Sequence, residues 1–387
     1  MSNILNRISS AIESNEVFYL SQLFDIFFIN RSRDVYQTLA SSLSQIKSQI
    51  RIDYWVTIIQ EIGKMAAIDP SAPSSISQQY PHFAEAASVF IKSEQNAELI
   101  CIIFKKICSS SLYFARDDDC YETICNSVLN KAYQKLNLVR KTTMVIDDPI
   151  LTVICSIVKV YLMKNNYDGA YKAFDSFLEI NTVDRNTSTV SELATYYFLK
   201  GKIDMVYNNR NSAFFKFKQS LELIPLDCVR DRRLVYAHSI PVSFTFGLIP
   251  NPELLEKYRL VDAYGDLATA ISTGDLALFD ACLARNELLY IYLGVWDMVV
   301  QSKKFVHRRI LEMVHREVND NKVPIEAFQR ALSLFGKEYS INETILVIAN
   351  LQYEKLVATN IAYQSKLILF NPGNEFSLPV PEDKADD

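Results

Sequence analysis

Apolar residues recur every three or four positions along most of this chain, and this spacing restricts it to helices that must cover one another. In residues 99–107 and again in 150–161, large aliphatic side chains fall on one side of a helix. Only nine glycines occur among the 387 residues, and the prolines lie mostly between apolar stretches. We therefore expect a mainly α fold, with long helices joined by short turns up to about residue 320.

Two degenerate copies of a helical repeat are visible in the middle of the chain. The segment 166–180 has small residues where helices approach and large residues between them, as in a tetratricopeptide-type helix. A second copy runs through 197–202 and 213–221 and ends before Pro225. We therefore expect a right-handed helical-repeat (TPR-like) solenoid, whose extended surface favours binding over catalysis.

The pattern changes after residue 320 in a way that predicts a winged helix. The helix 303–318 is expected to pack against a second helix that starts at Pro324. A capping box, Ser340-Ile341-Asn342-Glu343, starts a third helix. Beyond Leu356, apolar and polar residues alternate in two short strands joined at Gln364-Ser365-Lys366. Three helices followed by a small β-hairpin form a winged helix, and a helical bundle with an irregular end is the alternative.

These changes of pattern divide the chain into four parts. We expect an N-terminal helical repeat region at 1–205, the helical part of a second domain at 206–320, and the winged helix at 321–378. The tail 379–387 alternates proline and acid without an apolar stripe, so it is expected to be disordered.

Composition and charge exclude several classes of protein. Hydrophobic residues make up 49% and charged residues 22%, which is enough apolar material to bury a large interior. Because the formal net charge is −5, binding of nucleic acid would need a local basic patch. The seven cysteines form no CxxC pair, so we expect reduced thiols in the cytosol or nucleus. A secretory signal is not expected, because the N-terminal residues lack the basic start, apolar middle and small-residue cleavage site of such a signal. A membrane helix is not expected, because no apolar stretch approaches the roughly 18 residues needed.

Motifs for catalysis or cofactor binding are missing from the sequence. Gly265 and Gly274 are the closest two glycines, so neither a dinucleotide loop nor a phosphate-binding glycine loop can form. None of the four histidines lies in an HExxH motif, and no serine lies in a GxSxG elbow. His307 and His315 are about two helical turns apart, too far to share a metal. We expect no catalytic residues, metal or cofactor, and an unrecognised enzyme is the alternative.

Basic residues form three candidate sites for nucleic acid or an acidic partner. On the helix 303–318, spacings of one and four place several cations on one side, although Glu312 and Glu317 interleave and a solvated face is the alternative. Three lysines fall on the turn, the helix end and the wing, where winged helices contact the nucleic-acid backbone. Three arginines form a secondary basic point at a helix start, where a bound anion would offset the unfavourable helix dipole. The residues of these sites are, in order, Lys303, Lys304, Arg308, Arg309 and Arg316; Lys337, Lys355 and Lys366; and Arg230, Arg232 and Arg233.

Six short stretches carry a resemblance to a known family. They are 234–242 (LVYAHSIPV), 247–250 (GLIP), 254–258 (LLEKY), 270–276 (AISTGDL), 348–351 (IANL) and 366–372 (KLILFNP). Together they resemble the PCI domains of proteasome, signalosome and initiation-factor scaffolds, and most of all the TREX-two messenger-RNA export subunit and the signalosome subunit twelve-like proteins. The similarity spans about residues 230–376. The family usually has glycines where the third helix meets the wing, whereas Glu354, Lys355, Ala358 and Thr359 occupy that stretch here.

The resemblance implies a non-catalytic scaffold subunit of a nuclear complex that couples transcription to messenger-RNA export. Its partners would be a large helical scaffold protein, a small acidic, intrinsically disordered subunit shared with the proteasome lid, and RNA and duplex DNA bound without sequence preference. No membrane contact is expected. The location would be the nucleus, with the cytoplasm as a second site. The alternative is a signalosome-associated PCI subunit that acts only in protein–protein assembly.

Overall fold

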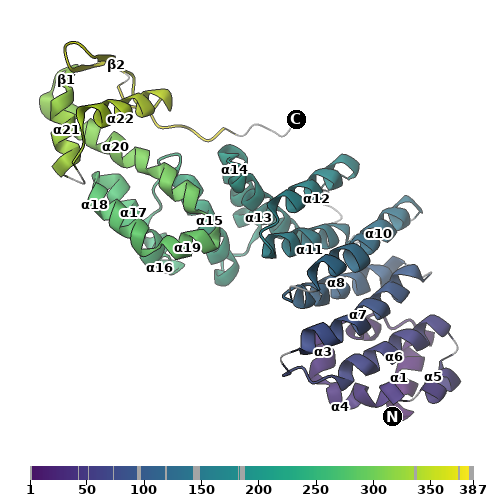
Figure 1. Cartoon of the computed structure of the whole chain (residues 1–387). Coiled ribbons are helices and arrows are strands. Elements are labelled where there is room, and N and C mark those ends of the chain that lie inside the picture. Colours follow the sequence, from purple (N-terminus) through teal and green to yellow (C-terminus); the bar gives the residue numbers. More distant parts are fainter. Residues whose placement is uncertain are drawn as a thin grey trace. The chain divides into compact units, whose positions relative to one another are not determined.

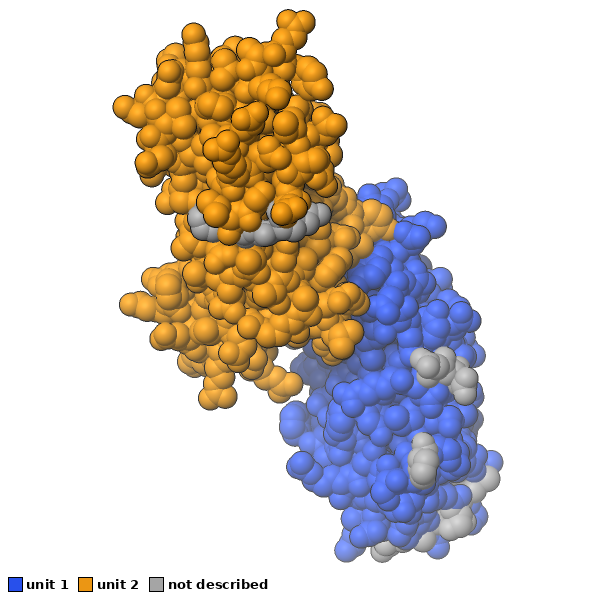
Figure 2. Space-filling model, turned by 60° about the vertical axis from the view of Figure 1, so that its left-hand side comes forward, with its two compact units in different colours: residues 1–199 blue, residues 200–387 orange. Residues whose placement is uncertain are grey.

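A computed structural model gives the fold (Figure 1) and describes residues 2–41, 43–50, 52–72, 74–93, 97–117, 120–142, 149–181, 183, 188–334, 338–373 and 375–382. The chain divides into two compact units, residues 1–199 and 200–387, which Figure 2 shows in different colours. The division lies near the boundary expected at 205, and the other expected boundaries stay predictions. Among the described helices, none has an apolar run long enough to cross a lipid bilayer.

The first unit consists of helices that pack on their neighbours in the sequence, such as α6 on α7 and α11 on α12. Its elements are α1 (Ser2–Glu13), α2 (Val17–Gln22), α3 (Ile26–Arg31), α4 (Arg33–Tyr36), the 3-10 helix η1 (Gln37–Ser41), α5 (Leu43–Gln49), α6 (Asp53–Ala67), α7 (Ser75–Lys92), α8 (Ala97–Phe114), α9 (Tyr121–Thr123), the π-helix η2 (Ile124–Leu129), α10 (Asn130–Thr142), α11 (Ile150–Met163), α12 (Tyr167–Ile180) and the first part of α13 (Val190–Val206), which continues into the second unit. The apolar stripes predicted at 99–107 and 150–161 fall on α8 and α11. The expected repeat helix at 166–180 is α12.

Aromatic rings fill the centre of the first unit. The ring of Phe90 on α7 lies 6.1 Å from that of Trp55 on α6 and 5.2 Å from that of Phe24. Phe83 of α7 lies 4.9 Å from Phe114 of α8. All five side chains are buried. Because each buried large side chain contributes about 1.5–3 kcal/mol, this cluster adds substantially to the stability of the first unit.

Most tight turns between the helices share one hydrogen-bonded motif. The residue after the helix end takes a left-handed conformation, as at Asn165, Asn208, Gly274 and Gly294. The next amide then donates back into the helix, for example from Asn166 to the Tyr161 carbonyl at 2.9 Å. Glycine and asparagine adopt this conformation at the least cost, so these residues mark where one helix ends and the next begins.

The second unit continues the helical stack and ends in a small sheet. Its elements are α14 (Arg210–Leu223), α15 (Val229–Phe244), α16 (Pro252–Lys257), α17 (Val261–Thr273), α18 (Leu276–Arg285), α19 (Glu287–Leu293), α20 (Trp296–Val318), β1 (Lys322–Pro324), α21 (Ile325–Leu334), α22 (Ile341–Tyr353), β2 (Thr359–Ala362) and β3 (Leu367–Phe370). Helix α20 packs on α15, α17, α18 and α19 and also on α21 and α22, so it joins the helical part to the winged helix.

A ladder of tyrosines connects three layers of this unit. The hydroxyl of Tyr264 donates to the Ala237 carbonyl at 2.6 Å, and that of Tyr290 donates to the Ala263 carbonyl at 2.5 Å, in each case 27 residues earlier. The two rings are nearly parallel, with centroids 6.0 Å apart. Each buried hydroxyl therefore satisfies a carbonyl of the preceding layer. This spacing of 27 residues gives no recognisable sequence pattern, because each layer contributes only one pair of a tyrosine hydroxyl and a carbonyl.

The winged helix predicted at the end of the chain is confirmed, with one strand more than expected. Its capping box is formed, because the Ser340 hydroxyl accepts from the Glu343 amide at 3.2 Å and the Glu343 carboxylate accepts from the Ser340 amide at 2.8 Å. Strands β2 and β3 are the expected hairpin, and β1 pairs with the other side of β3 to give the antiparallel order β1-β3-β2. Pro324 closes β1, and α21 starts one residue later than predicted. Proline is tolerated there because β1 is an edge strand.

Candidate nucleic-acid interface

Helix α20 carries the five cations of the main candidate site, and the structure turns most of them toward carboxylates of the same chain. The Lys303 amine lies 2.6 and 2.8 Å from the two carboxylate oxygens of Asp280 on α18. The Lys304 amine lies 2.9 Å from a carboxylate oxygen of Glu354, just after α22, and only 15% of the Lys304 side chain is exposed. Burial lowers the pKa of Lys304, although the Glu354 carboxylate opposes the shift. These two lysines join α20 to its neighbours.

The three arginines of α20 meet at one carboxylate, that of Glu312. Its oxygens lie 3.4 Å from Arg308, 3.3 Å from Arg309 and 2.5 Å from Arg316. Arg309 also donates to the Ser272 carbonyl at 3.0 Å. Burial lowers the pKa of Arg308, although Glu312 opposes the shift. Of the three, only Arg316 is mostly exposed, with 65% of its side chain accessible. Binding of phosphate by this helix stays a prediction, and Arg316 is its most accessible member.

The lysines predicted around the wing have different surroundings. Lys355 is exposed and follows α22 in the left-handed conformation, with φ of 56°. Lys366 has the same φ at the turn between β2 and β3, and its exposed amine lies 3.6 Å from Glu326. Lys337 lies outside the described residues. Lys355 and Lys366 are therefore the cations of the predicted set that the fold leaves accessible on the winged helix.

The three arginines of the secondary basic point differ in their exposure to solvent. Arg232 is buried and donates to the carbonyls of Leu221 and Ile224 at 2.8 and 2.7 Å, and to the Tyr258 hydroxyl at 3.0 Å. Burial lowers its pKa, but hydrogen bonds with tyrosine hydroxyls outweigh this and leave the pKa raised. Arg232 lies near the start of α15, as predicted, and its guanidinium also caps the carboxyl end of α14, where the dipole favours positive charge. Binding of an anion at this point stays a prediction. Arg230 and Arg233 are exposed.

The exposed face of α22 carries no cation and is partly apolar. In a helix-turn-helix arrangement, the second helix enters the DNA groove, and α22 is in that position after α21. Its sequence has no lysine or arginine. Leu346 and Tyr353 are 60% and 87% exposed, and Asn350 lies between them on the same face. Because arginine and lysine make the commonest contacts to phosphates and guanines, this face is better suited to protein than to duplex DNA.

Both histidines of α20 have packing roles. The His307 ring lies against Tyr339, and burial lowers its pKa to about 4. The His315 ring lies 4.3 Å from Phe370 and 5.7 Å from Phe376. Within the described ranges, no three side chains of histidine, cysteine, aspartate or glutamate converge as a metal site would require. The expectation that the chain is not an enzyme stays a prediction.

Curated proteins similar to this chain belong to one group. The chain is 27% identical to the PCI domain-containing protein 2 homolog of Caenorhabditis elegans over 188 residues, or 48% of this chain and 45% of that protein. It is 22% identical to the corresponding homolog of Dictyostelium discoideum over 266 residues, or 68% and 61%. It is 24% identical to Protein CSN12 homolog of Gibberella zeae over 202 residues, or 48% and 44%. No family model matches the sequence.

The chain is thus similar to PCI domain-containing protein 2 and CSN12 homologues, with distant but consistent matches over about half of its length or more. The matches span about half the length of the curated relatives, between 44% and 61% for the three just described. The resemblance that the sequence suggested is confirmed, and so is the fold that it implied, a PCI domain with stacked helices and a terminal winged helix.

The PCI fold also explains the departure from the family pattern between α22 and the wing. Where glycine is usual, Lys355 adopts the left-handed conformation itself, and the Leu356 amide then donates to the Leu351 carbonyl at 2.9 Å. The backbone thus makes the usual helix end without glycine. The turn therefore exposes the Lys355 side chain, although residues other than glycine seldom adopt the left-handed conformation because it is strained.

The segment after β3 also belongs to the site, and no motif in the sequence indicated this. This C-terminal strap, residues 375–382, runs back from the wing along α20 (Figure 1). The Arg308 side chain donates to the Ser377 carbonyl at 3.1 Å and lies over the Phe376 ring. A Cβ atom on Gly247 would come within 2.8 Å of Leu378, so the strap also packs against the end of α15. At Glu382 the amide donates to Asn211 at 3.3 Å, which gives the start of the tail expected at 379–387 a defined contact.

Proposed function

We propose that this chain is a non-catalytic scaffold subunit of a nuclear complex that couples transcription to messenger-RNA export. Its helices bind a large helical scaffold partner and a small acidic, disordered subunit, and its winged helix binds RNA or duplex DNA without sequence preference. The observation that carries the proposal is a winged helix at the end of a helical stack in a chain similar to PCI domain-containing protein 2 homologs. Such an architecture offers extended surfaces for association.

Within this proposal, nucleic acid contacts the wing side of the domain rather than α20. Lys355 and Lys366 are exposed there, and the carboxylate of Glu326 lies 3.6 Å from Lys366. The side chains of Lys303, Lys304 and Arg308 are only 28%, 15% and 14% exposed, and each lies 2.6 to 3.4 Å from a carboxylate of the chain. A cation that already has a carboxylate partner gains less from a phosphate, because the existing pair must be broken first. Exposed lysines on a turn and a wing fit contacts to the backbone of nucleic acid, which carry no sequence information.

The experiment reverses two charges in each of two places. Lys355→Asp with Lys366→Asp alters the wing, and Arg230→Asp with Arg233→Asp is a control with the same change in net charge. Aspartate tolerates the left-handed backbone of both lysines, so the wing variant should fold. Fluorescence anisotropy with labelled single-stranded RNA and duplex DNA is measured over a series of salt concentrations.

We expect the wing variant to bind about tenfold more weakly and with a salt slope lower by about two, because each lost phosphate contact removes about one unit of slope. The control should bind like the wild type. Equal affinities and slopes for the wing variant and the wild type would refute the assignment to the wing. A loss confined to the control would move the site to the start of α15.

A second candidate function keeps the fold and changes the complex. The face of α22, which has no cation and exposes Leu346 and Tyr353, favours a signalosome-associated subunit whose winged helix contacts only protein. Affinity purification followed by mass spectrometry separates the two. Recovery of deneddylase subunits without export factors supports this second candidate, and recovery of export factors supports the first.

A further inference from the structure

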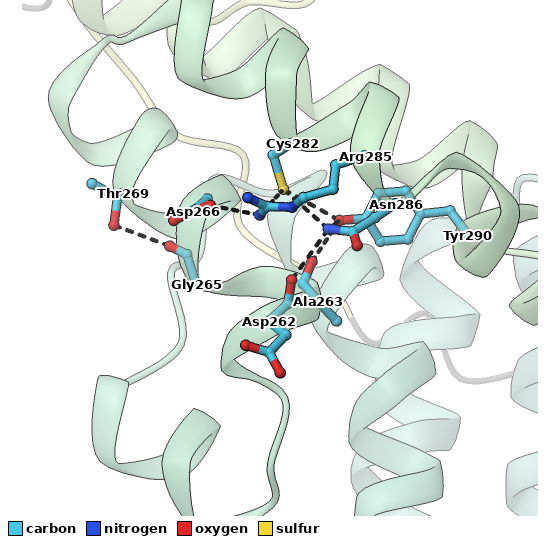
Figure 3. Close-up of polar contacts among 9 residues, drawn as sticks. All are labelled: Asp262, Ala263, Gly265, Asp266, Thr269, Cys282, Arg285, Asn286 and Tyr290. Atoms are coloured by element: carbon cyan, nitrogen blue, oxygen red, sulfur yellow. Dashed lines mark hydrogen bonds and ion pairs between the residues drawn. The ribbon is translucent and has the colours of Figure 1, made fainter.

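Helix α19 is a short helix held rigidly from one side. The Tyr290 hydroxyl donates to the Ala263 carbonyl on α17, and the Asn286 amide donates to the Asp262 carbonyl at 3.2 Å (Figure 3). Asn286 also donates to the Cys282 sulfur at 3.4 Å, beneath the start of the helix. Because its inner face is fixed to α17 and α18 by these bonds, the outer face is presented in one orientation.

The outer face of α19 is apolar and exposed. Leu288, Ile291 and Tyr292 have the i, i+3, i+4 spacing that places them on one side of a helix, opposite Tyr290. They are 83%, 54% and 87% exposed, while Tyr290 is fully buried. Isolated exposed apolar residues are normal, but three on adjacent turns of a fixed helix form a continuous patch of the kind that marks an interaction site.

Carboxylates flank this patch at both of its ends. At the start of α19 lie Glu287 and Asp262, and Figure 3 shows the Asp262 carboxylate directed away from Asn286. Beyond the other end, Asp297 lies in the first turn of α20, directly after the turn that ends α19. All three are exposed. Arg285, the nearest cation in the sequence before α19, is already bound to Asp266 at 2.6 Å.

We infer that the outer face of α19 binds an amphipathic helix of another protein, one with aliphatic residues at i, i+3, i+4 spacing and lysine or arginine near both ends. The aliphatic stripe covers Leu288, Ile291 and Tyr292, and the basic ends pair with the three carboxylates. Charge decides between the possible occupants. An acidic segment would meet three negative charges here, so this surface differs from the one that the proposed small acidic subunit would need.

The test uses the full chain and two labelled, helix-forming peptides with the same leucine stripe. One peptide carries lysines at both ends and the other carries glutamates. Fluorescence anisotropy should show that the lysine peptide binds at least about tenfold more tightly than the glutamate peptide. Leu288→Glu with Tyr292→Glu should weaken binding of the lysine peptide at least about tenfold. Circular dichroism checks that this variant remains folded.

Two further variants keep the inference falsifiable. Glu287→Gln with Asp297→Asn leaves the apolar patch intact and should reduce the preference for the lysine peptide. Leu346→Glu with Tyr353→Glu changes the exposed face of α22 and should leave both peptides unaffected.

Several results would overturn the inference. They are equal binding of the two peptides, no saturable binding of either, or an equal loss in the α22 variant. If sedimentation shows that the chain dimerises and that Leu288→Glu makes it monomeric, the occupant is a second copy instead. None of these results bears on the wing lysines, so failure here is distinct from failure of the proposed function.

Discussion

Replacing Arg232 with methionine tests whether this buried cation stabilises the second unit or forms part of a binding site for an anion. The guanidinium makes two short hydrogen bonds, to the carbonyls of Leu221 and Ile224, and longer ones to the hydroxyls of Tyr258 and Tyr236. A hydrogen bond to a charged group contributes about 1.5–3 kcal/mol, so the two short bonds alone suggest a loss of about 3–6 kcal/mol. Methionine recovers part of the packing, which brings the expected loss to about 3 kcal/mol. Arg232→Lys, with one compact ammonium, should cost about half as much.

Urea denaturation followed by tryptophan fluorescence measures this loss in the second unit alone. The chain has only two tryptophans, Trp55 in the first unit and Trp296 in the second. In a Trp55→Phe background, Trp296 is the single reporter. With a denaturant slope of about 1–3 kcal/mol per molar, the Arg232→Met midpoint should fall by about 1–3 M. Arg230→Met, at an exposed position of the same helix turn, should stay within about 0.5 kcal/mol of the background.

If Arg232→Met unfolds at the same urea concentration as Arg230→Met, Arg232 does not stabilise the second unit. The purely structural role is also refuted if inorganic phosphate stabilises the wild type but not Arg232→Met, since that result would make Arg232 part of an anion site. The structure predicts the same phosphate response for both proteins, because the donors of Arg232 already have carbonyl and hydroxyl acceptors.

Three more predictions concern stability. Burial lowers the pKa of His307 to about 4 against about 6.5 in the unfolded chain, so the unfolded state binds more protons between these values and stability falls as the pH drops, by about 2 kcal/mol at about pH 5. His307→Gln should reduce the fall of the urea midpoint between pH 7 and 5 by about half, because burial also lowers the pKa of His238, to about 3, and that group contributes a similar loss. Arg259→Gly relieves a left-handed backbone at φ of 52° and should raise the melting temperature by a few degrees, corresponding to about 0.5–1 kcal/mol; a lower melting temperature would contradict this. Phe376→Ala removes the ring that the strap places against Arg308 and His315, and urea denaturation should show a free energy of unfolding lower by about 2–4 kcal/mol. Its control is Val380→Ala, at an exposed strap position, which should lower the free energy of unfolding by less than about 0.5 kcal/mol.

Local signals in the sequence predicted the parts of the fold that depend on local chemistry. The capping box at Ser340 and the turn at Gln364-Ser365-Lys366 follow from residues that lie next to each other, and both are confirmed. Strand β1 was missed because it has three residues, ends in proline and exists only through its pairing with β3. Its one apolar residue, Val323, cannot show alternation by itself.

The candidate site could be predicted only in part, because its contacts join distant parts of the chain. The basic spacing on α20 is visible in the sequence, but Lys304 pairs with Glu354 across 50 residues and Arg308 reaches Ser377 across 69. Likewise, the apolar spacing of α19 looks like a core stripe until the fold shows that only Tyr290 faces inward. Sequence spacing gives the face of a helix, and it does not say whether anything covers that face.

The C-terminal strap has a consequence for the order in which the chain matures. Its residues are synthesised after every surface that they cover, so the Phe305 ring, Gly247 and Asn211 stay open while the preceding helices and the sheet leave the ribosome. The first unit and most of the second can therefore fold early, and the strap attaches the winged helix to the helical stack only after these elements have formed.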